Sequence, residues 1–347
     1  MIFCMRLLII TQAVDLKDAN LGFFHEWIKE FAKRVSVVEV IALRVGEHNL
    51  PENVSVHRIF GSNKLSRFIR MAGLLRQLLP QSDRVFVHMA PIYAILASPF
   101  AWWYRKPVIL WYVHKHVDLK LRIAEKLVSA VASASPESFR LPSRKVLFLG
   151  HGIDVDLFAL PATAPAGFAM LTAGRLSRLK RIDILLQAVS AASNQLPSDW
   201  RFNIVGSPIT ADDVRYQHEL TDLAQSLGIA DHVSFAGGVP HSQMPAHYQS
   251  AHLFLHASAT GSIDKAVLEA MSTGLPLITS SEAFRSILPE EYIVKTASVE
   301  SFASMIVGLE TQGRDIRLRN IVREKFELSD LIRKLVIQLT ALSVPID

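Results

Sequence analysis

The sequence has little cysteine and no uninterrupted apolar stretch long enough to cross a membrane. These two shortages argue against a disulfide-stabilised protein and against a membrane-spanning one. The 347 residues include one cysteine, Cys4, so no intrachain disulfide can form, which is typical of a chain in a reducing compartment. Residues 85–104 carry no formal charge, but they contain Pro91 and Pro99, and proline interrupts a membrane-spanning helix. We interpret them as a buried strand, a loop and a helix.

Other common features are also missing from the sequence. The N-terminal segment has no basic region followed by a small-residue cleavage site, as a secretory signal would have. We therefore expect a cytoplasmic protein, either free or peripheral on the cytoplasmic face of a membrane. There is no repeat of 20–50 residues and no low-complexity segment, which excludes solenoid architectures. Half of the residues are hydrophobic and 20% are charged, as in a folded globular chain.

The positive charge is unevenly distributed. The net charge is +5, but residues 1–160 carry 21 Lys and Arg against 13 Asp and Glu, whereas the remainder carries 16 against 19. A basic N-terminal half fits an anionic partner, such as phospholipid headgroups or a phosphate-bearing acceptor. An ordinary surface excess explains the numbers equally well. We expect no nucleic acid as a partner.

Short β-rich runs alternate with helical patterns along the whole chain, which predicts an α/β fold with parallel sheets. An uncharged segment rich in proline and alanine, residues 160–167, follows the first series of such runs and is typical of a linker. We predict two Rossmann-like domains facing a central cleft, residues 1–160 and 161–347, with the last helix able to pack back on the first domain. Ligands of such sheets lie at the carboxyl ends of the strands.

The strongest local signal is the segment from Gly174 to Asp183. It follows a predicted strand, opens a predicted helix, and places Arg175 and Lys180 five residues apart. A guanidinium fork and a compact ammonium group together suit a diphosphate. Two cations at a helix start are unfavourable for the helix dipole unless an anion is present, although they also fit a solvated surface.

A second signal runs from Ser258 to Met271. A loop of small residues follows the strand that ends at His256 and leads into a helix, whose first N–H groups can bind a phosphate or a sugar hydroxyl. In the alternative interpretation, Asp264 or Ser262 caps the helix and Glu269 is an exposed partner of Lys265.

Together these segments resemble the retaining glycosyltransferases of family four, which have the two-domain B-type fold. The resemblance rests on Gly174-Arg175 with Lys180, on Glu269-Ala270-Met271, and on Gly274-Leu275-Pro276. Weaker likenesses lie at the remaining motifs along the chain: residues 21–25, 107–114, 150–158 and 204–206. Two positions depart from the family pattern, since Gly261 stands where the first of two glutamates is expected and Arg181 replaces a glycine.

The resemblance implies a role for each matching residue. Arg175 and Lys180 would hold the donor diphosphate, Glu269 the nucleotide ribose, and Gly206 would approach the nucleotide. The loop and helix start would face the sugar and the β-phosphate; this segment comprises Gly261, Ser262, Ile263, Asp264, Lys265 and Ala266. His114 would contact the donor sugar. On the acceptor side the candidates are Gly22 and His25.

The function that this implies is a retaining transfer of sugar from a nucleotide-sugar donor to a glycan, glycolipid or related acceptor, in cell-envelope polysaccharide biosynthesis. We expect no cofactor and no metal ion, because two cationic side chains can stabilise the departing diphosphate. The alternatives are a non-catalytic nucleotide-sugar-binding relative, or another enzyme of this fold such as an epimerase or a phosphorylase.

Residues 64–79 predict an amphipathic helix with a basic face. The apolar positions recur at helical spacing (Leu65, Phe68, Ile69, Ala72, Leu75 and Leu79), and four of the remaining positions are basic. Such a helix suits peripheral contact with an anionic membrane. A core-facing helix with a solvated basic side has the same pattern.

Overall fold

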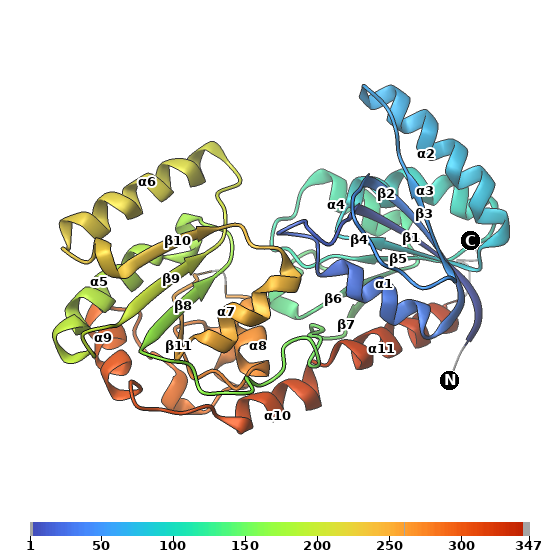
Figure 1. The fold of residues 1–347 in the computed structure, drawn as a ribbon. Coiled ribbons are helices and arrows are strands. Elements are labelled where there is room, and N and C mark those ends of the chain that lie inside the picture. The colour runs from blue at the N-terminus through green and yellow to red at the C-terminus, as the bar shows by residue number, and fades with distance from the viewer. Residues whose placement is uncertain (1–2, 260, 343–347) are drawn as a thin grey trace. The chain divides into compact units, whose positions relative to one another are not determined.

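The computed structural model describes residues 3–259 and 261–342, which form two units (Figure 1). Unit 1 contains residues 3–152, the short segment Pro240–Ser242, and the last helix of the chain. Unit 2 contains Ile153–Val239 and Gln243–Glu327. Each unit has its own parallel sheet with helices on both faces, so the prediction of an α/β chain with two Rossmann-like domains is confirmed.

The sheet of unit 1 has the strand order β3-β2-β1-β4-β5-β6-β7 within the described residues, and every pairing is parallel. The order reverses between β1 and β4, which is the switch point of a doubly wound sheet. The strands are β1 (Phe3–Val14), β2 (Val35–Val45), β3 (Val54–Arg58), β4 (Arg84–His88), β5 (Val108–Trp111), β6 (Ala130–Ser133) and β7 (Val146–Phe148).

Two layers of helices enclose this sheet. Helices α1 (Phe24–Ala32) and α11 (Leu328–Ala341) pack on one face, and their apolar side chains form one core with alternate strand residues. Helices α2 (Lys64–Leu78), α3 (Pro91–Trp103) and α4 (Leu119–Leu127) pack on the other face over a second core. Because α11 joins the first core, both ends of the chain belong to unit 1.

Helix α2 exists as expected, but the prediction that its apolar residues form one continuous face is wrong. Leu75 and Leu79 are buried in the core beneath the helix, whereas Leu65, Phe68 and Ile69 are exposed. The reason is that only the C-terminal half of α2 packs on the sheet, where Met71, Leu74 and Leu78 are also buried. The N-terminal half of α2 is exposed to solvent.

The sheet of unit 2 repeats the same topology with five strands in the described residues, in the order β10-β9-β8-β11-β12. Its switch point lies between β8 and β11. The strands are β8 (Ala169–Ala173), β9 (Arg201–Val205), β10 (Val233–Gly237), β11 (Leu253–His256) and β12 (Leu277–Thr279). On one face lie α5 (Ile182–Ala192), α6 (Ala211–Ser226) and α9 (Val299–Gly308), and on the other α7 (Met244–Ser250), α8 (Lys265–Ser272) and α10 (Ile316–Lys325).

The boundary between the units differs from the predicted one at residue 160. It lies at Gly152–Ile153, because Ile153, Val155 and Phe158 are buried in the core of unit 2. Residues 85–104 form β4 and α3, as the sequence predicts. Among the helices of the described residues, none is both long and apolar enough to cross a bilayer.

Candidate functional site

The candidate site of unit 2 lies at the switch point of its sheet. Strand β8 ends at Ala173 and leads into the Gly174–Arg181 loop, while β11 ends at His256 and leads into the loop before α8. Since β8 and β11 are neighbours and parallel, both loops leave the same edge of the sheet. The two strongest sequence signals are therefore brought together: the backbone N–H of Ala259 donates to the carbonyl of Leu179, 80 positions earlier in the chain, at 2.9 Å.

Two glycines shape this edge. Gly206 follows β9 with φ +148°, and a Cβ built on it would lie 1.8 Å from the carbonyl oxygen of Gly174. Gly174 itself has φ +131°, a conformation that favours glycine. A side chain at position 206 would displace the backbone that precedes Arg175. Gly206 therefore has a structural reason to be glycine, in addition to the nucleotide contact that the resemblance implies.

Arg175 is held by a buried carboxylate from α6. Its Nε and Nη2 donate to Oδ2 of Asp213 at 2.9 and 2.7 Å. The same oxygen accepts the backbone N–H groups of Ile209 and Thr210 at 3.0 and 2.8 Å. Burial raises the pKa of Asp213, but these hydrogen bonds outweigh burial and lower it to about 2, so the carboxylate stays ionised. The Arg175 side chain remains 42% exposed, and a guanidinium has five N–H donors, so some are available to a ligand.

Lys180 is held by Asp264 in the same way. The Lys180 ammonium group donates to Oδ2 of Asp264, and both side chains are largely buried. Asp264 also caps α8, because its Oδ1 accepts the backbone N–H of Ala266 at 3.2 Å. Burial raises the pKa of Asp264, yet the charge of Lys180 and the hydrogen bond from His256 hold it well below its usual range. The cap that the sequence analysis considered is present, and it is also a counter-ion.

A chain of hydrogen bonds fixes Asp264 from behind. Nε2 of the buried His256 lies 3.2 Å from Oδ2 of Asp264, and its Nδ1 lies 2.8 Å from Oγ1 of Thr279. A carboxylate only accepts, so Nε2 is the donor, and a neutral ring then accepts the Thr279 hydroxyl at Nδ1. Burial lowers the pKa of His256, against the raising effect of Asp264, which fits that neutral form. Lys180 is thereby positioned by residues at the ends of β11 and β12.

The start of α8 carries most of the remaining candidates. Gly261 has φ +61°, in the left-handed region, and Ser262 and Ile263 are half-buried between it and the cap. Thr260, which belongs to the same motif, lies outside the described residues. Burial lowers the pKa of Lys265 to about 8, although Glu269 and Asp264 act in the opposite direction. An ammonium group at this position carries a charge that varies near neutral pH.

Glu269 is not the exposed residue of the alternative interpretation. It is 7% exposed in the middle of α8, and its Oε2 accepts the hydroxyl of the buried Tyr248 at 2.9 Å. The pKa of Tyr248 is raised well above its ordinary value, first by burial and then by the charge of Glu269. Tyr248 therefore remains a hydrogen-bond donor that fixes the orientation of this carboxylate.

The acceptor candidates lie in unit 1 after β1, and the structure gives both a local role. A Cβ on Gly22 would lie 2.6 Å from the carbonyl oxygen of Asp18, so the turn needs glycine. The His25 side chain is only 1% exposed. Its Nε2 accepts the backbone N–H of Asn49 at 3.0 Å, and its Nδ1 lies 3.2 Å from Oε1 of Glu26. Both ring nitrogens of His25 thus bind the protein itself, which favours a structural role.

His114 lies beyond the strand end where the sequence placed it. Strand β5 ends at Trp111, and His114 follows in an exposed loop, where its Nδ1 accepts the backbone N–H of His116 at 3.1 Å. A different histidine occupies the switch point of unit 1. His88, at the end of β4, is buried, stacks on Phe24 at 3.8 Å between ring centroids, and lies 3.3 Å from Oγ1 of Thr11.

Several residues of the unit 2 site were missed from the sequence. Asp213, Tyr248 and Thr279 belong to no motif that marks them as site residues, because their partners are far away in the chain. Asp213 and Arg175, for example, are 38 positions apart. No group of three or more His, Cys, Asp and Glu side chains in residues 3–259 and 261–342 could hold a metal ion.

Comparisons with known proteins find similarity to glycosyl transferases. Residues 167–312 match the model of the family described as "Glycosyl transferases group 1". The GtfA subunit of a UDP-N-acetylglucosamine–peptide N-acetylglucosaminyltransferase from Streptococcus parasanguinis is 26% identical over 179 residues, which are 49% of this chain and 33% of that protein. A D-inositol 3-phosphate glycosyltransferase from Nocardiopsis dassonvillei is 25% identical, over 47% of this chain and 41% of the relative.

Solved structures resemble the chain over nearly its whole length. Anabaena HepE in complex with UDP and glucose has a TM-score of 0.75 at 16% identity, covering 97% of this chain and all of that chain. WaaG, a glycosyltransferase involved in lipopolysaccharide biosynthesis, has a TM-score of 0.65 at 14% identity, with the same coverage. At these identities the likeness shows the fold, which is the B-type fold of glycosyltransferases. The chain spans well under half the length of the curated relatives it matches.

Proposed function

Because residues 167–312 match the model of the group 1 glycosyl transferases, we propose that this chain transfers a sugar from a nucleotide-sugar donor to an acceptor. The observation that carries the proposal is the pair of cations at the switch point of unit 2. Arg175 and Lys180 come from one loop, and each is held by an ionised, largely buried carboxylate. Cations fixed in this way are oriented before the ligand arrives, which lowers the entropic cost of binding a diphosphate.

The proposed donor lies across the edge formed by β8 and β11. Its diphosphate contacts the free donors of Arg175 and the ammonium group of Lys180, and Lys265 adds a third charge when it is protonated. Glu269 is proposed to accept the ribose hydroxyls, and the hydrogen bond from Tyr248 to its Oε2 fixes the orientation of the carboxylate. Gly261, with no side chain, leaves the sugar in contact with the backbone of the loop before α8.

The proposed reaction retains the configuration of the sugar. As the bond between the sugar and the diphosphate breaks, negative charge grows on the departing phosphate oxygen. Arg175 and Lys180 stabilise that charge, and the departing diphosphate accepts the proton of the acceptor hydroxyl. No protein carboxylate has to act as a nucleophile, and Asp213 and Asp264 serve to position the two cations.

The donor base and the acceptor are finer proposals that rest on the relatives. HepE is described with UDP and glucose, and GtfA with UDP-N-acetylglucosamine, so a uridine diphosphate sugar is the first donor to test. WaaG acts in lipopolysaccharide biosynthesis, and we propose a glycan or lipid-linked acceptor in cell-envelope polysaccharide biosynthesis. His114 and the Gly22 turn are the candidates for contacts with the donor sugar and the acceptor.

The test is a screen of labelled nucleotide sugars in two steps. Thermal unfolding identifies the nucleotides that bind, because a ligand specific for the native state raises the melting temperature with its concentration. Hydrolysis or transfer of the sugar from the binding nucleotide is then measured. The proposal predicts slow release of the sugar without acceptor and faster release with it. Binding without any release or transfer, with every acceptor class tried, would instead support the non-catalytic relative.

A further inference from the structure

The cations on one side of unit 1 have no carboxylate partners. Residues 53–127, from β3 to the end of α4, carry twelve Lys and Arg but only Asp83, Asp118 and Glu125 as acids. None of the twelve makes an ion pair with any residue that the structure describes, and ten of them form a group: Arg58, Lys64, Arg67, Arg70, Arg76, Arg105, Lys106, Lys120, Arg122 and Lys126. They lie on or next to α2, α3 and α4, the layer that covers one face of the sheet.

The three acids of this segment are occupied by other bonds. Oδ2 of Asp83 accepts the backbone N–H of Arg6 at 2.8 Å, and Oδ1 of Asp118 caps α4 through the N–H of Leu121 at 2.8 Å. Oε1 of Glu125 accepts the Ser143 hydroxyl at 2.6 Å. The positive field of the layer is therefore not neutralised by close ion pairs.

The same helices expose large apolar side chains. At the start of α2, Leu65 and Ile69 are 66% and 62% exposed, and at the end of α3, Trp102 and Trp103 are 62% and 76% exposed. Other exposed apolar residues of the layer are Phe60, Phe68, Leu119, Ile123 and Leu127. Exposed large apolar groups gathered on a few neighbouring elements indicate a contact surface, whereas single ones do not.

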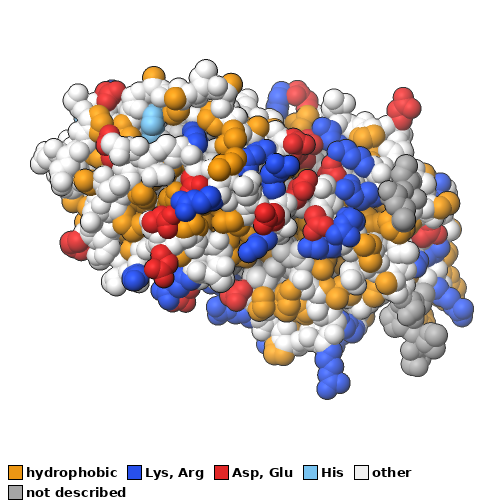
Figure 2. All heavy atoms as spheres, turned by 90° about the horizontal axis from the view of Figure 1, so that it is seen from below, with side chains coloured by type: hydrophobic (Ala, Val, Ile, Leu, Met, Phe, Trp, Pro, Cys, Tyr) orange, Lys and Arg blue, Asp and Glu red, His pale blue; other side chains and the backbone are white. Residues whose placement is uncertain are grey.

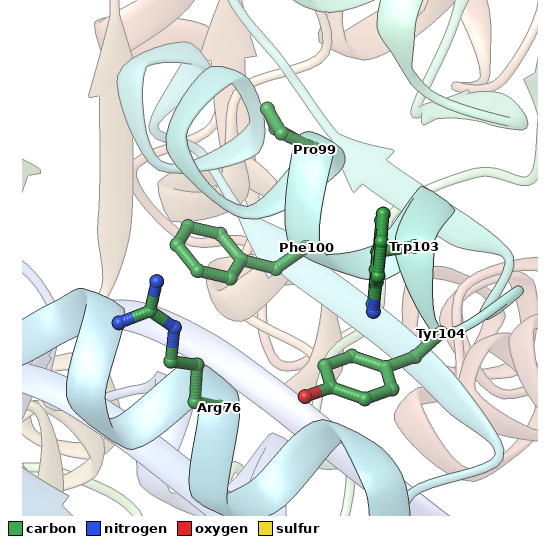
Figure 3. A pocket seen from close by; sticks show the side chains of 5 residues that line it. All are labelled: Arg76, Pro99, Phe100, Trp103 and Tyr104. Carbon is green, nitrogen blue, oxygen red and sulfur yellow. The ribbon is translucent and has the colours of Figure 1, made fainter.

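A pocket between α2 and α3 combines the two properties. Arg76, Pro99, Phe100, Trp103 and Tyr104 line a cavity of about 450 Å³ (Figure 3). The guanidinium carbon of Arg76 lies 5.7 Å from the centre of the Phe100 ring, and the three aromatic side chains and Arg76 surround the same space. An arginine beside tryptophan and tyrosine fits the boundary where a lipid phosphate meets its acyl chains.

From these observations we propose that the outer surface of α2, α3 and α4 docks on a bilayer that contains anionic phospholipids. The unpaired cations attract the headgroups, and Leu65, Ile69, Trp102 and Trp103 enter the interface between headgroups and acyl chains. A nucleic acid would use the cations, but it offers these exposed apolar side chains no apolar environment to enter.

The cations of α1 and α11, on another surface of unit 1, pair with carboxylates of their own helix. On α11, Arg333 and Lys334 both pair with Asp330, and on α1, Lys33 and Arg34 both pair with Glu30. On the face drawn in Figure 2, Lys and Arg side chains lie beside Asp and Glu side chains in the same way. The layer of α2, α3 and α4 lacks this pairing, which is why we assign it to the bilayer.

The experiment is flotation of the whole chain with phosphatidylcholine vesicles, with and without one third phosphatidylglycerol, at low and high salt. We expect binding to the anionic vesicles alone and at least a tenfold loss of binding at high salt, because screening weakens interactions between exposed charges. The triple variants Lys64→Gln/Arg67→Gln/Arg70→Gln and Leu65→Ser/Phe68→Ser/Ile69→Ser are each expected to lose at least tenfold in vesicle affinity, and Trp102→Ser/Trp103→Ser likewise.

The matched control is Arg333→Gln/Lys334→Gln, which removes two paired cations of unit 1 and is expected to bind vesicles as the parent does. Thermal unfolding confirms that each variant folds. Equal vesicle binding by the parent and all three test variants would overturn the proposal. Loss in the charge variant with none in the two apolar variants would overturn the insertion of the apolar side chains and leave only electrostatic attraction to the anionic surface. The measurement involves no nucleotide or sugar, so its outcome is separate from that of the transferase assay.

Discussion

The cations of the two units differ in their partners, and the difference indicates what each set binds. In unit 2, Arg175 and Lys180 are each fixed by one largely buried carboxylate, so their positions are set by the fold. In unit 1, the cations of α2, α3 and α4 lie on the surface without ion pairs among the described residues. A fixed pair suits a small anion of definite shape, whereas a diffuse set suits an extended anionic surface.

The comparison also explains why net charge is a poor guide to the sites. Residues 161–347 contain Arg175 and Lys180, the proposed diphosphate site. Yet this half of the chain has a net charge of −3, from 16 basic and 19 acidic residues. Acids there, such as Asp213 and Asp264, accompany the cations that the site needs. The basic half has its excess where the partner is proposed to be a surface.

The largest expected effect comes from removing either fixed cation. Arg175→Ala and Lys180→Ala should each lower kcat/KM by on the order of 10²-fold or more, the usual consequence of losing a group that stabilises charge in the transition state. The control is Arg178→Ala in the same loop, whose side chain pairs with Glu219 on the surface and is expected to be dispensable. Near-parental kcat/KM in both test variants, with normal folding, would show that the donor site is elsewhere.

A smaller effect is expected at Glu269. Glu269→Gln keeps the shape but removes the charge that is proposed to accept two ribose hydroxyls. Calorimetric titration with a nucleoside diphosphate should give a dissociation constant about tenfold weaker, corresponding to roughly 1.4 kcal/mol. Because Tyr248 donates to Glu269, Tyr248→Phe should weaken binding in the same direction by less. Unchanged affinity in the Gln variant would show that Glu269 does not bind the ribose.

Lys265 should make the binding of a nucleoside diphosphate depend on pH. Burial lowers its pKa to about 8, and a bound diphosphate favours the charged form. Binding should therefore take up a proton above pH 8, and affinity should fall by up to about tenfold per pH unit as the pH rises through this value. Titrations at several pH values test this, and Lys265→Met should abolish the extra slope. A parental affinity independent of pH between 7 and 9.5 would contradict the assignment.

The smallest expected effect is that of a chelator. Since Arg175 and Lys180 are proposed to stabilise the departing diphosphate, sugar transfer should continue at an unchanged rate in excess chelator. The measurement is the initial rate before and after chelation, and with magnesium or manganese added back. Complete loss that either ion restores would mean that the fixed cations do not suffice.

Much of the fold could be predicted because its determinants are local. Strand β8 precedes Gly174 and strand β11 ends at His256, as the sequence predicts, since each is a short apolar run with a clear end. Strands β3 and β7 have no comparable signal in the sequence. Both lie at the edges of their sheet and are only partly buried, so their sequences lack the continuous apolar run of a central strand.

The site could be predicted in part for the same physical reason. Arg175, Lys180 and Glu269 were identified by their spacing within single segments, and such spacing can be seen in one sequence without a structure. Their partners Asp213 and Tyr248 were not, because each reaches the site from another element of the fold. The sequence also did not predict that α2 is exposed in its N-terminal half and buried in its C-terminal half. The exposure of a helix depends on how far the sheet extends beneath it.

The most direct test of the central claim is a titration that compares a nucleoside monophosphate with the diphosphate of the same base. If Arg175 and Lys180 hold the diphosphate and Glu269 the ribose, the parent should bind the diphosphate more tightly, and Lys180→Ala should lose that preference. Glu269→Gln should weaken both nucleotides equally, and Arg67→Gln on α2 should change neither. A preference for the diphosphate that persists in both Lys180→Ala and Arg175→Ala would contradict the account.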